Sequence, residues 1–147
     1  MNKSRAILIW LVFILFLFDR LLKKIVIHLA PGTSDDFFYF TLYINKSGPF
    51  SLALPSVFLI AIATVVLIWL TYLGWQFFKV KNLNRLLGIS LMLVGGFSNF
   101  WDRVLVGGVI DIWYLPVLTG LNFNLADIYL LSGVLILVLS YYRPYSK

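Results

Sequence analysis

The sequence predicts an all-α membrane protein with four transmembrane helices and short strands outside them. The chain is 61% hydrophobic and only 12% charged, and its mean hydropathy is +0.94, whereas about a quarter of the residues in a typical soluble domain are charged. Apolar stretches recur along the chain, and one crossing needs about 20 residues. The 147 residues therefore have room for one domain of about four spans.

The first predicted span covers residues 6–30. It begins with an uninterrupted apolar run after basic residues, as a secretory signal peptide does. The sequence DRLLKK follows this run and no small-residue cleavage site is present, so we expect the span to be retained. Its second half carries Asp19 and Lys23, which lie four residues apart and therefore share one helix face.

The loop 31–55 is predicted to lie outside the membrane. Its stretch FFYFTLYI at 37–44 is aromatic and β-branched, which is typical of a strand, and NKSGP at 45–49 is a turn signal. Residues 56–75 then carry no charge and form the clearest span of the chain.

The second half of the chain holds two more predicted spans. Residues 86–101 are short for a full crossing at about 1.5 Å per residue, so the far end of this span lies at or just below the membrane surface. The loop 102–123 includes a short strand at 108–115, and the fourth span covers 124–142. There is no internal repeat or linker, so we expect a single domain over 1–147.

Four spans place both ends of the chain on the same side of the membrane. That side also holds the loop between the second and third spans, and it carries most of the basic residues: Lys3, Arg5, Lys79, Lys81, Arg85, Arg143 and Lys147. The positive-inside rule then places both termini in the cytoplasm. The loops 31–55 and 102–123 are expected to face outward.

Residue usage excludes several kinds of chemistry. The chain has no cysteine, one histidine (His28) and six acidic residues, all of them Asp. Without cysteine there is no disulfide, thiolate metal site or Cys nucleophile, and one histidine argues against a Ser-His-Asp triad or a multi-histidine metal site. We expect no metal and no cofactor. The net charge of +6 follows the membrane topology, so we expect no nucleic-acid partner.

The polar residues converge on the outward face. They come from the end of the first span, the turn after the first strand, the end of the third span, the second strand and the start of the fourth span: Asp19, Lys23, Asn45, Asn99, Asp102, Arg103, Asp111, Asn124 and Asp127. Ionisable residues at membrane depth are candidates for function. The pattern predicts one shared site at this face.

Asp111 and Asp127 are the candidate catalytic pair. Two carboxylates brought close together cannot both ionise easily, so they share a proton. One carboxylate can then act as a base on water, while the protonated one polarises a carbonyl and later protonates the amine. Nearby Asn side chains could orient the water or bind the developing oxyanion. Arg103 could hold a carboxylate or a phosphate.

The same residues also have structural interpretations. Asn124 with Asp127 three residues later is the pattern of a helix N-terminus, with Asn as the cap and Asp facing the helix dipole. Asp19 and Lys23 fit a structural ion pair. Asn45 fits an ordinary turn residue.

Three short blocks of sequence resemble those of the lipoprotein signal peptidases, bacterial intramembrane aspartyl proteases with four spans. NFWDRVLVGGVIDI at 99–112 is similar to that family's Asn-x-x-Asp-Arg-x-x-x-Gly-x-Val-x-Asp-Phe block. FNLAD at 123–127 matches the Phe-Asn-x-Ala-Asp block, and DRLLK at 19–23 keeps the Asp and Lys of the first-helix block. Order, spacing and hydropathy fit along the whole chain.

The resemblance implies an aspartic endopeptidase that removes the signal peptide of diacylglyceryl-modified prolipoproteins by cutting before the lipid-bearing Cys. The outward strands would form a small β-cradle around the substrate, and the enzyme would lie in the bacterial cytoplasmic membrane with its active site at the outer face. Membrane lipids would be its other partners, and we expect a monomer. Asp111 and Asp127 would be catalytic. Substrate and dyad would be positioned by Asn45, Asn99, Arg103 and Asn124, and supported by Asp19, Lys23 and Asp102.

The chain also departs from the family's pattern. Arg20 stands where Gln is usual, Ser98 where Gly usually precedes the Asn, and Ile112 where Phe follows the first catalytic Asp. The family's Asn-x-Gly-x-x-Phe block is NKSGPF here, with Ser47 at the Gly position. The segment between this block and the second span, which the family uses as a flap, is short. These departures bear on substrate gating and on Asn45, and they leave the dyad intact.

Rival functions predict other patterns. A small transporter or channel subunit would spread polar residues through the membrane depth, whereas here they gather at one face. A lipid-headgroup enzyme with Arg103 on the phosphate would normally use a metal or histidine and a larger basic patch. A purely structural membrane protein would have no reason to keep NxxDR and FNLAD at one interface.

Overall fold

The computed structural model describes residues 3–29, 39–48, 54–116 and 121–142. That part of the chain is mostly helical, with a small sheet. Its elements, in chain order, are α1 (Lys3–Leu29), β1 (Tyr39–Asn45), α2 (Ser56–Lys79), α3 (Leu83–Val106), β2 (Val109–Leu115), β3 (Leu121–Phe123) and α4 (Leu125–Tyr142).

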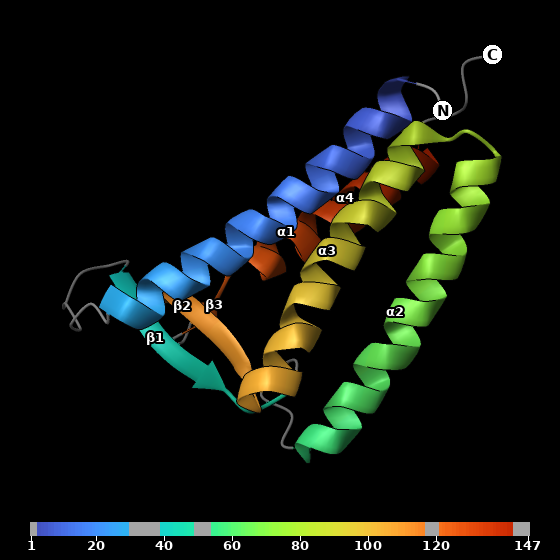
Figure 1. The fold of residues 1–147 in the computed structure, drawn as a ribbon. Coiled ribbons are helices and arrows are strands. Elements are labelled where there is room, and N and C mark those ends of the chain that lie inside the picture. The colour runs from blue at the N-terminus through green and yellow to red at the C-terminus, as the bar shows by residue number, and fades with distance from the viewer. Residues whose placement is uncertain (1–2, 30–38, 49–53, 117–120, 143–147) are drawn as a thin grey trace.

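The central helix is α3, which packs against α1, α2 and α4. The start of α1, the end of α4 and the turn between α2 and α3 lie at one end of the molecule, and the sheet lies at the other (Figure 1). The elements that were expected to carry polar residues therefore meet at one end.

Two helices, α2 and α4, are long and apolar enough to cross a membrane. Only 11% of the most apolar window of α2 is buried within the protein, and large side chains such as Val57, Ile68 and Trp69 point outward. A soluble protein would bury a helix of this kind in its core. The exposed apolar surface therefore fits contact with lipid.

The third helix is longer than the span predicted at 86–101. It starts earlier because the Asn82 side chain accepts a hydrogen bond from the Arg85 backbone N (3.1 Å) and caps its first turn. It ends later because Gly107 adopts a left-handed conformation at φ 77° and closes the last turn. The polar residues beyond position 101 are therefore helical and face the interior.

Small residues bring α3 and α4 close together. A Cβ on Gly88 would lie 2.9 Å from the Gly133 carbonyl oxygen, and one on Gly95 would overlap the Ala126 carbonyl oxygen. Helices that pack in a membrane commonly use small residues in this way, because the backbones can then approach. The close packing fixes the start of α4 against the middle of α3.

The sheet is antiparallel with strand order β1-β2-β3. The strands expected at 37–44 and 108–115 correspond to β1 and β2; residues 37 and 38 lie outside the described ranges. Tyr43 is paired with Asp111 and Asn45 with Val109, so the end of β1 lies beside the Asp-bearing part of β2. The strand β3 was not predicted, because three residues are too few to show alternation.

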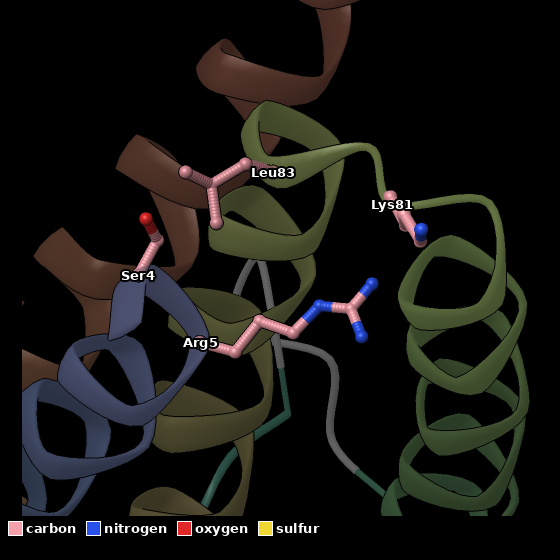
Figure 2. A pocket seen from close by; sticks show the side chains of 4 residues that line it. All are labelled: Ser4, Arg5, Lys81 and Leu83. Carbon is pink, nitrogen blue, oxygen red and sulfur yellow. The ribbon is translucent and has the colours of Figure 1, made fainter. Parts of the chain in front are cut away.

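At the end opposite the sheet, a cavity of about 500 Å³ is lined by Ser4, Arg5, Lys81 and Leu83 (Figure 2). Arg5 donates from Nη2 to the Phe78 carbonyl oxygen (2.8 Å), and its guanidinium lies 4.2 Å from the centre of the Phe78 ring. These contacts join the start of α1 to the end of α2.

Candidate active site

The sheet end of the molecule gathers polar residues from four elements. Asp111 lies in β2, Asn45 ends β1, Asn99 lies on α3, and Asn124 immediately precedes α4, whose first turn holds Asp127. The chain between β2 and α4 folds back through β3, so residues that are distant in sequence meet here. Asp111 and Asn124 are 1% and 0% exposed.

The Asp111 carboxylate is held by two amides. Asn124 donates from Nδ2 to Oδ1 (2.9 Å), and Asn45 donates from Nδ2 to Oδ2 (3.2 Å). Burial, together with the neighbouring Asp127 charge, raises the pKa of Asp111 to about 6, although the two amides and Lys23 oppose the rise. A carboxyl group with this pKa can hold a proton close to neutral pH.

Asp127 is held by Asn99 and by the helix N-terminus. Asn99 donates from Nδ2 to Asp127 Oδ1 (2.8 Å), and the Asn124 backbone N donates to Asp127 Oδ2 (3.0 Å). In return, the Asp127 backbone N donates to Asn124 Oδ1 (3.1 Å). The structural interpretation is therefore confirmed, since Asn124 caps α4. It does not exclude the functional one.

Asn124 links the two carboxylates directly. Its Nδ2 donates to Asp111 Oδ1 and, at 3.2 Å, to Asn99 Oδ1, while its backbone N donates to Asp127. One buried amide residue thus sets the position of both acids. The same Asn124 residue caps the start of α4.

A second cluster lies behind the dyad between α1 and α3. Lys23 is 1% exposed, and its Nζ lies 2.7 Å from Asp102 Oδ2, 3.2 Å from Asp19 Oδ2 and 3.4 Å from Asn99 Oδ1. The ion pair expected between Asp19 and Lys23 is therefore present. Asp102 Oδ2 also accepts from the Ile110 backbone N (3.2 Å), which is the residue before Asp111.

Arg103 reaches toward the loop after β1. Its Nη2 donates to the Ser47 carbonyl oxygen (2.9 Å), and the Ser47 backbone N donates to Asn45 Oδ1 (3.0 Å). The Arg103 Nη1 atom is buried and has no hydrogen-bond partner among the described residues. Arg103 belongs to the site around the dyad, because its charge interacts with those of Asp111 and Asp127.

Two residues of the second cluster were noticed in the sequence only as departures from a pattern. Arg20 donates from Nη1 to Asp102 Oδ1 (2.6 Å), and its Nη2 contacts Asp19 Oδ2 and Ser98 Oγ. Ser98 in turn donates to Asp19. A basic residue next to Asp19, directly after the long apolar run of α1, was the available signal for Arg20. Ser98 gave none, because serine is common in helices of every environment.

His28 lies apart from the site, with Nδ1 2.9 Å from the Lys24 carbonyl oxygen on the exposed end of α1. Within the described ranges, no three side chains of His, Cys, Asp or Glu lie close enough together to hold a metal ion. The segment expected to act as a flap is residues 51–55, of which 51–53 lie outside the described residues.

Comparisons with known proteins place the chain in a family. The model of the family described as signal peptidase (SPase) II matches residues 11–143. The chain is 31% identical to a lipoprotein signal peptidase of Streptococcus pneumoniae, with 94% of each chain covered. It is also 31% identical to one of Gloeothece citriformis, with 100% of this chain and 95% of the relative covered.

The fold comparison agrees. Two bacterial membrane enzymes, solved by the in meso method at 2.3 and 1.9 Å resolution, each superpose with a TM-score of 0.78 at 26% sequence identity. The first match covers 92% of this chain and 87% of the other, and the second covers 94% of both. The sequence and fold comparisons together show that this chain belongs to the signal peptidase II family.

Proposed function

We propose that this enzyme removes signal peptides from diacylglyceryl-modified prolipoproteins with Asp111 and Asp127 as its catalytic dyad. Family membership makes the protein a lipoprotein signal peptidase, and that family consists of aspartic-type proteases. The observation that supports the dyad is the shared anchor: Asn124 donates to Asp111 from its side chain and to Asp127 from its backbone. The other two described Asp residues, Asp19 and Asp102, both form ion pairs with Arg20 and Lys23. Among the described residues, Asp111 and Asp127 are thus the two carboxylates without an ion-pair partner.

The proposed reaction uses one proton shared between the two acids. The ionised carboxylate takes a proton from water, and the resulting hydroxyl adds to the carbon of the scissile amide. The protonated carboxyl donates its proton to the carbonyl oxygen, which gives a tetrahedral diol. Collapse of the diol breaks the C–N bond, the nitrogen takes a proton from one acid of the dyad, and one diol hydroxyl returns its proton to the other acid. A carboxylic acid and an amine leave, and the dyad again holds one proton.

The amide and guanidinium groups around the dyad supply orientation. Asn45 and Asn124 keep both Asp111 oxygens in place. Asn99 holds Asp127 Oδ1, and the Asn124 backbone N holds Asp127 Oδ2. We assign the free Nη1 donor of Arg103 to a backbone carbonyl of the bound substrate, because a buried donor without a partner is costly until something accepts from it.

We further propose that all four helices span the bacterial cytoplasmic membrane, with both termini in the cytoplasm. The basic turn between α2 and α3 lies at the same end as the start of α1 (Figure 2), which fits the positive-inside rule. The dyad then lies at the outer face, where a lipid-anchored substrate presents its cleavage site. The site residues all come from one chain, so a monomer surrounded by lipid suffices.

The decisive experiment is cleavage of a diacylglyceryl-modified prolipoprotein by the purified protein in detergent, with a chelator present. The parent should cleave, and Asp111→Asn and Asp127→Asn should each lose about 10³-fold or more, since each removes one partner of general acid–base catalysis. His28→Gln, on the exposed end of α1, is the control for an unrelated polar substitution. Activity that survives in either well-folded Asn variant would refute the dyad.

A further inference from the structure

Arg20 and Ser98 touch each other inside the cluster behind the dyad. Arg20 Nη2 donates to Ser98 Oγ, and Ser98 Oγ donates to Asp19 Oδ2. Both are positions at which the sequence departs from the blocks that it otherwise resembles. Two departures that are 78 positions apart in sequence are therefore in direct contact. This contact indicates that they function together.

Their cluster is balanced in charge and almost fully buried. Two carboxylates, Asp19 and Asp102, face two cations, Arg20 and Lys23. Asp19, Asp102 and Lys23 are at most 1% exposed, and the Arg20 side chain is 21% exposed. Without the guanidinium, two buried carboxylates would share a single ammonium, and an unpaired buried charge is strongly unfavourable.

The contacts of the Arg20 guanidinium leave Lys23 able to contact Asn99. Arg20 occupies Asp102 Oδ1 (2.6 Å) and Asp19 Oδ2 (2.8 Å), so Lys23 is not the sole partner of either acid. Lys23 can then lie 3.4 Å from Asn99 Oδ1, on the side of the cluster that faces the dyad. Asn99 uses its other amide atom to donate to Asp127.

We infer that Arg20 and Ser98 are a positioning pair, which holds the carboxylates of Asp19 and Asp102 so that Lys23 stays against Asn99, the side chain that orients Asp127. Neither residue touches the substrate or the reacting atoms. A second route runs through Asp102, which accepts from the Ile110 backbone N and so ties the cluster to the strand that carries Asp111. The inference rests on the proposed function, because it assigns a role in that reaction.

The test is a cycle of Arg20→Gln, Ser98→Ala and the double variant, assayed with the same lipid-modified substrate. Arg20→Gln should lower kcat about tenfold and leave KM within about twofold, since positioning acts on the bound substrate. Ser98→Ala should lower kcat about threefold alone and produce little further loss in the Arg20→Gln background, because contacting residues are not additive. Arg5→Gln, the same change at the far end of α1, should leave kcat unchanged.

The pH profile separates positioning from mere folding. The charged groups that act on Asp111 are Asp127 of α4, Lys23 of α1 and Arg103 of α3. From β1, the titratable Tyr43 is the cross-strand partner of Asp111. Loss of the Arg20 charge leaves net negative charge behind the dyad, so both limbs of the profile should move to higher pH in Arg20→Gln. Arg20→Lys keeps the charge and should keep the parent's profile, while it loses the two-pronged contact and part of kcat.

The outcomes are distinct. A parent that does not cleave would overturn the proposed function, and with it any role of this pair in catalysis. An active parent whose Arg20→Gln and Ser98→Ala effects simply multiply, or whose variants lose only thermal stability while kcat and the pH profile stay unchanged, would overturn the positioning pair alone. A shared, non-additive loss of kcat with the shifted profile would establish it.

Discussion

The two ends of this molecule handle charge in opposite ways. At the sheet end, Lys23 and Arg20 are held by carboxylates in the interior. At the other end, Arg5 and Arg85 lie over aromatic rings, 4.2 Å from the centre of Phe78 and 4.0 Å from the centre of Tyr141. A cation in the protein interior needs a counter-ion to offset its lost hydration, whereas one at the surface needs only a ring or a carbonyl.

This difference assigns different tasks to the two ends. The basic end can tolerate change, because Arg5 and Arg85 are only half-buried and neither is held by a carboxylate in the described part of the chain. The sheet end cannot, because each of its charges depends on the others. Substitutions at the sheet end are therefore expected to have the largest effects.

Replacing Lys23 with Met should cause the largest loss of stability. The substitution leaves Asp19 and Asp102 buried with only Arg20 between them. Removal of one partner from a buried ion pair costs about 3–5 kcal/mol. Unfolding in mixed micelles, followed by far-UV circular dichroism, would measure the loss. An unchanged unfolding midpoint would mean that the cluster is not a buried charge network.

Asp111 should make the protein more stable in acid than near neutral pH. Its pKa rises from 3.8 to about 6 in the folded protein, so the folded state binds the extra proton more tightly than the unfolded state does. The resulting stabilisation is complete below about pH 4 and is lost as the pH rises through about 6, to an extent of about 3 kcal/mol.

Comparison of the parent with Asp111→Asn checks this sign. The free energy of unfolding of the parent should fall between pH 4 and pH 7, and that of Asp111→Asn should fall less by the contribution above. A difference of the opposite sign would show that Asp111 is ionised more easily in the folded protein than in the unfolded one.

Arg5→Gln should have the smallest effect. It removes a hydrogen bond to the Phe78 carbonyl and a cation–π contact, and a half-buried contact of this kind contributes about 1 kcal/mol. Unfolding and cleavage assays on this variant should both stay close to the parent. If its loss of stability matched that of Lys23→Met, the contrast between the two ends would be wrong.

Most residues of the candidate site could be predicted from the sequence, because they lie in two short blocks that resemble the family's. The spacing from Asn99 to Asp111 and the FNLAD block named the residues that the structure brings together around Asp111 and Asp127. The expectation that Asn124 caps a helix also held. Hydrophobicity predicted four helical segments, although the bounds of α3 moved, since caps and not hydropathy decide where a helix ends.

Sequence alone thus determined the class of the protein, the four apolar segments and the residue types of the dyad, because these depend on composition, periodicity and local motifs. Three features came from the packing of the folded chain: Arg20 meets Ser98, Asp102 connects α1 to β2, and one Arg103 donor is left free. Such contacts join residues that are distant along the chain. They depend on how closely α1, α3 and β2 pack, and a local sequence pattern does not determine the distance between separate elements.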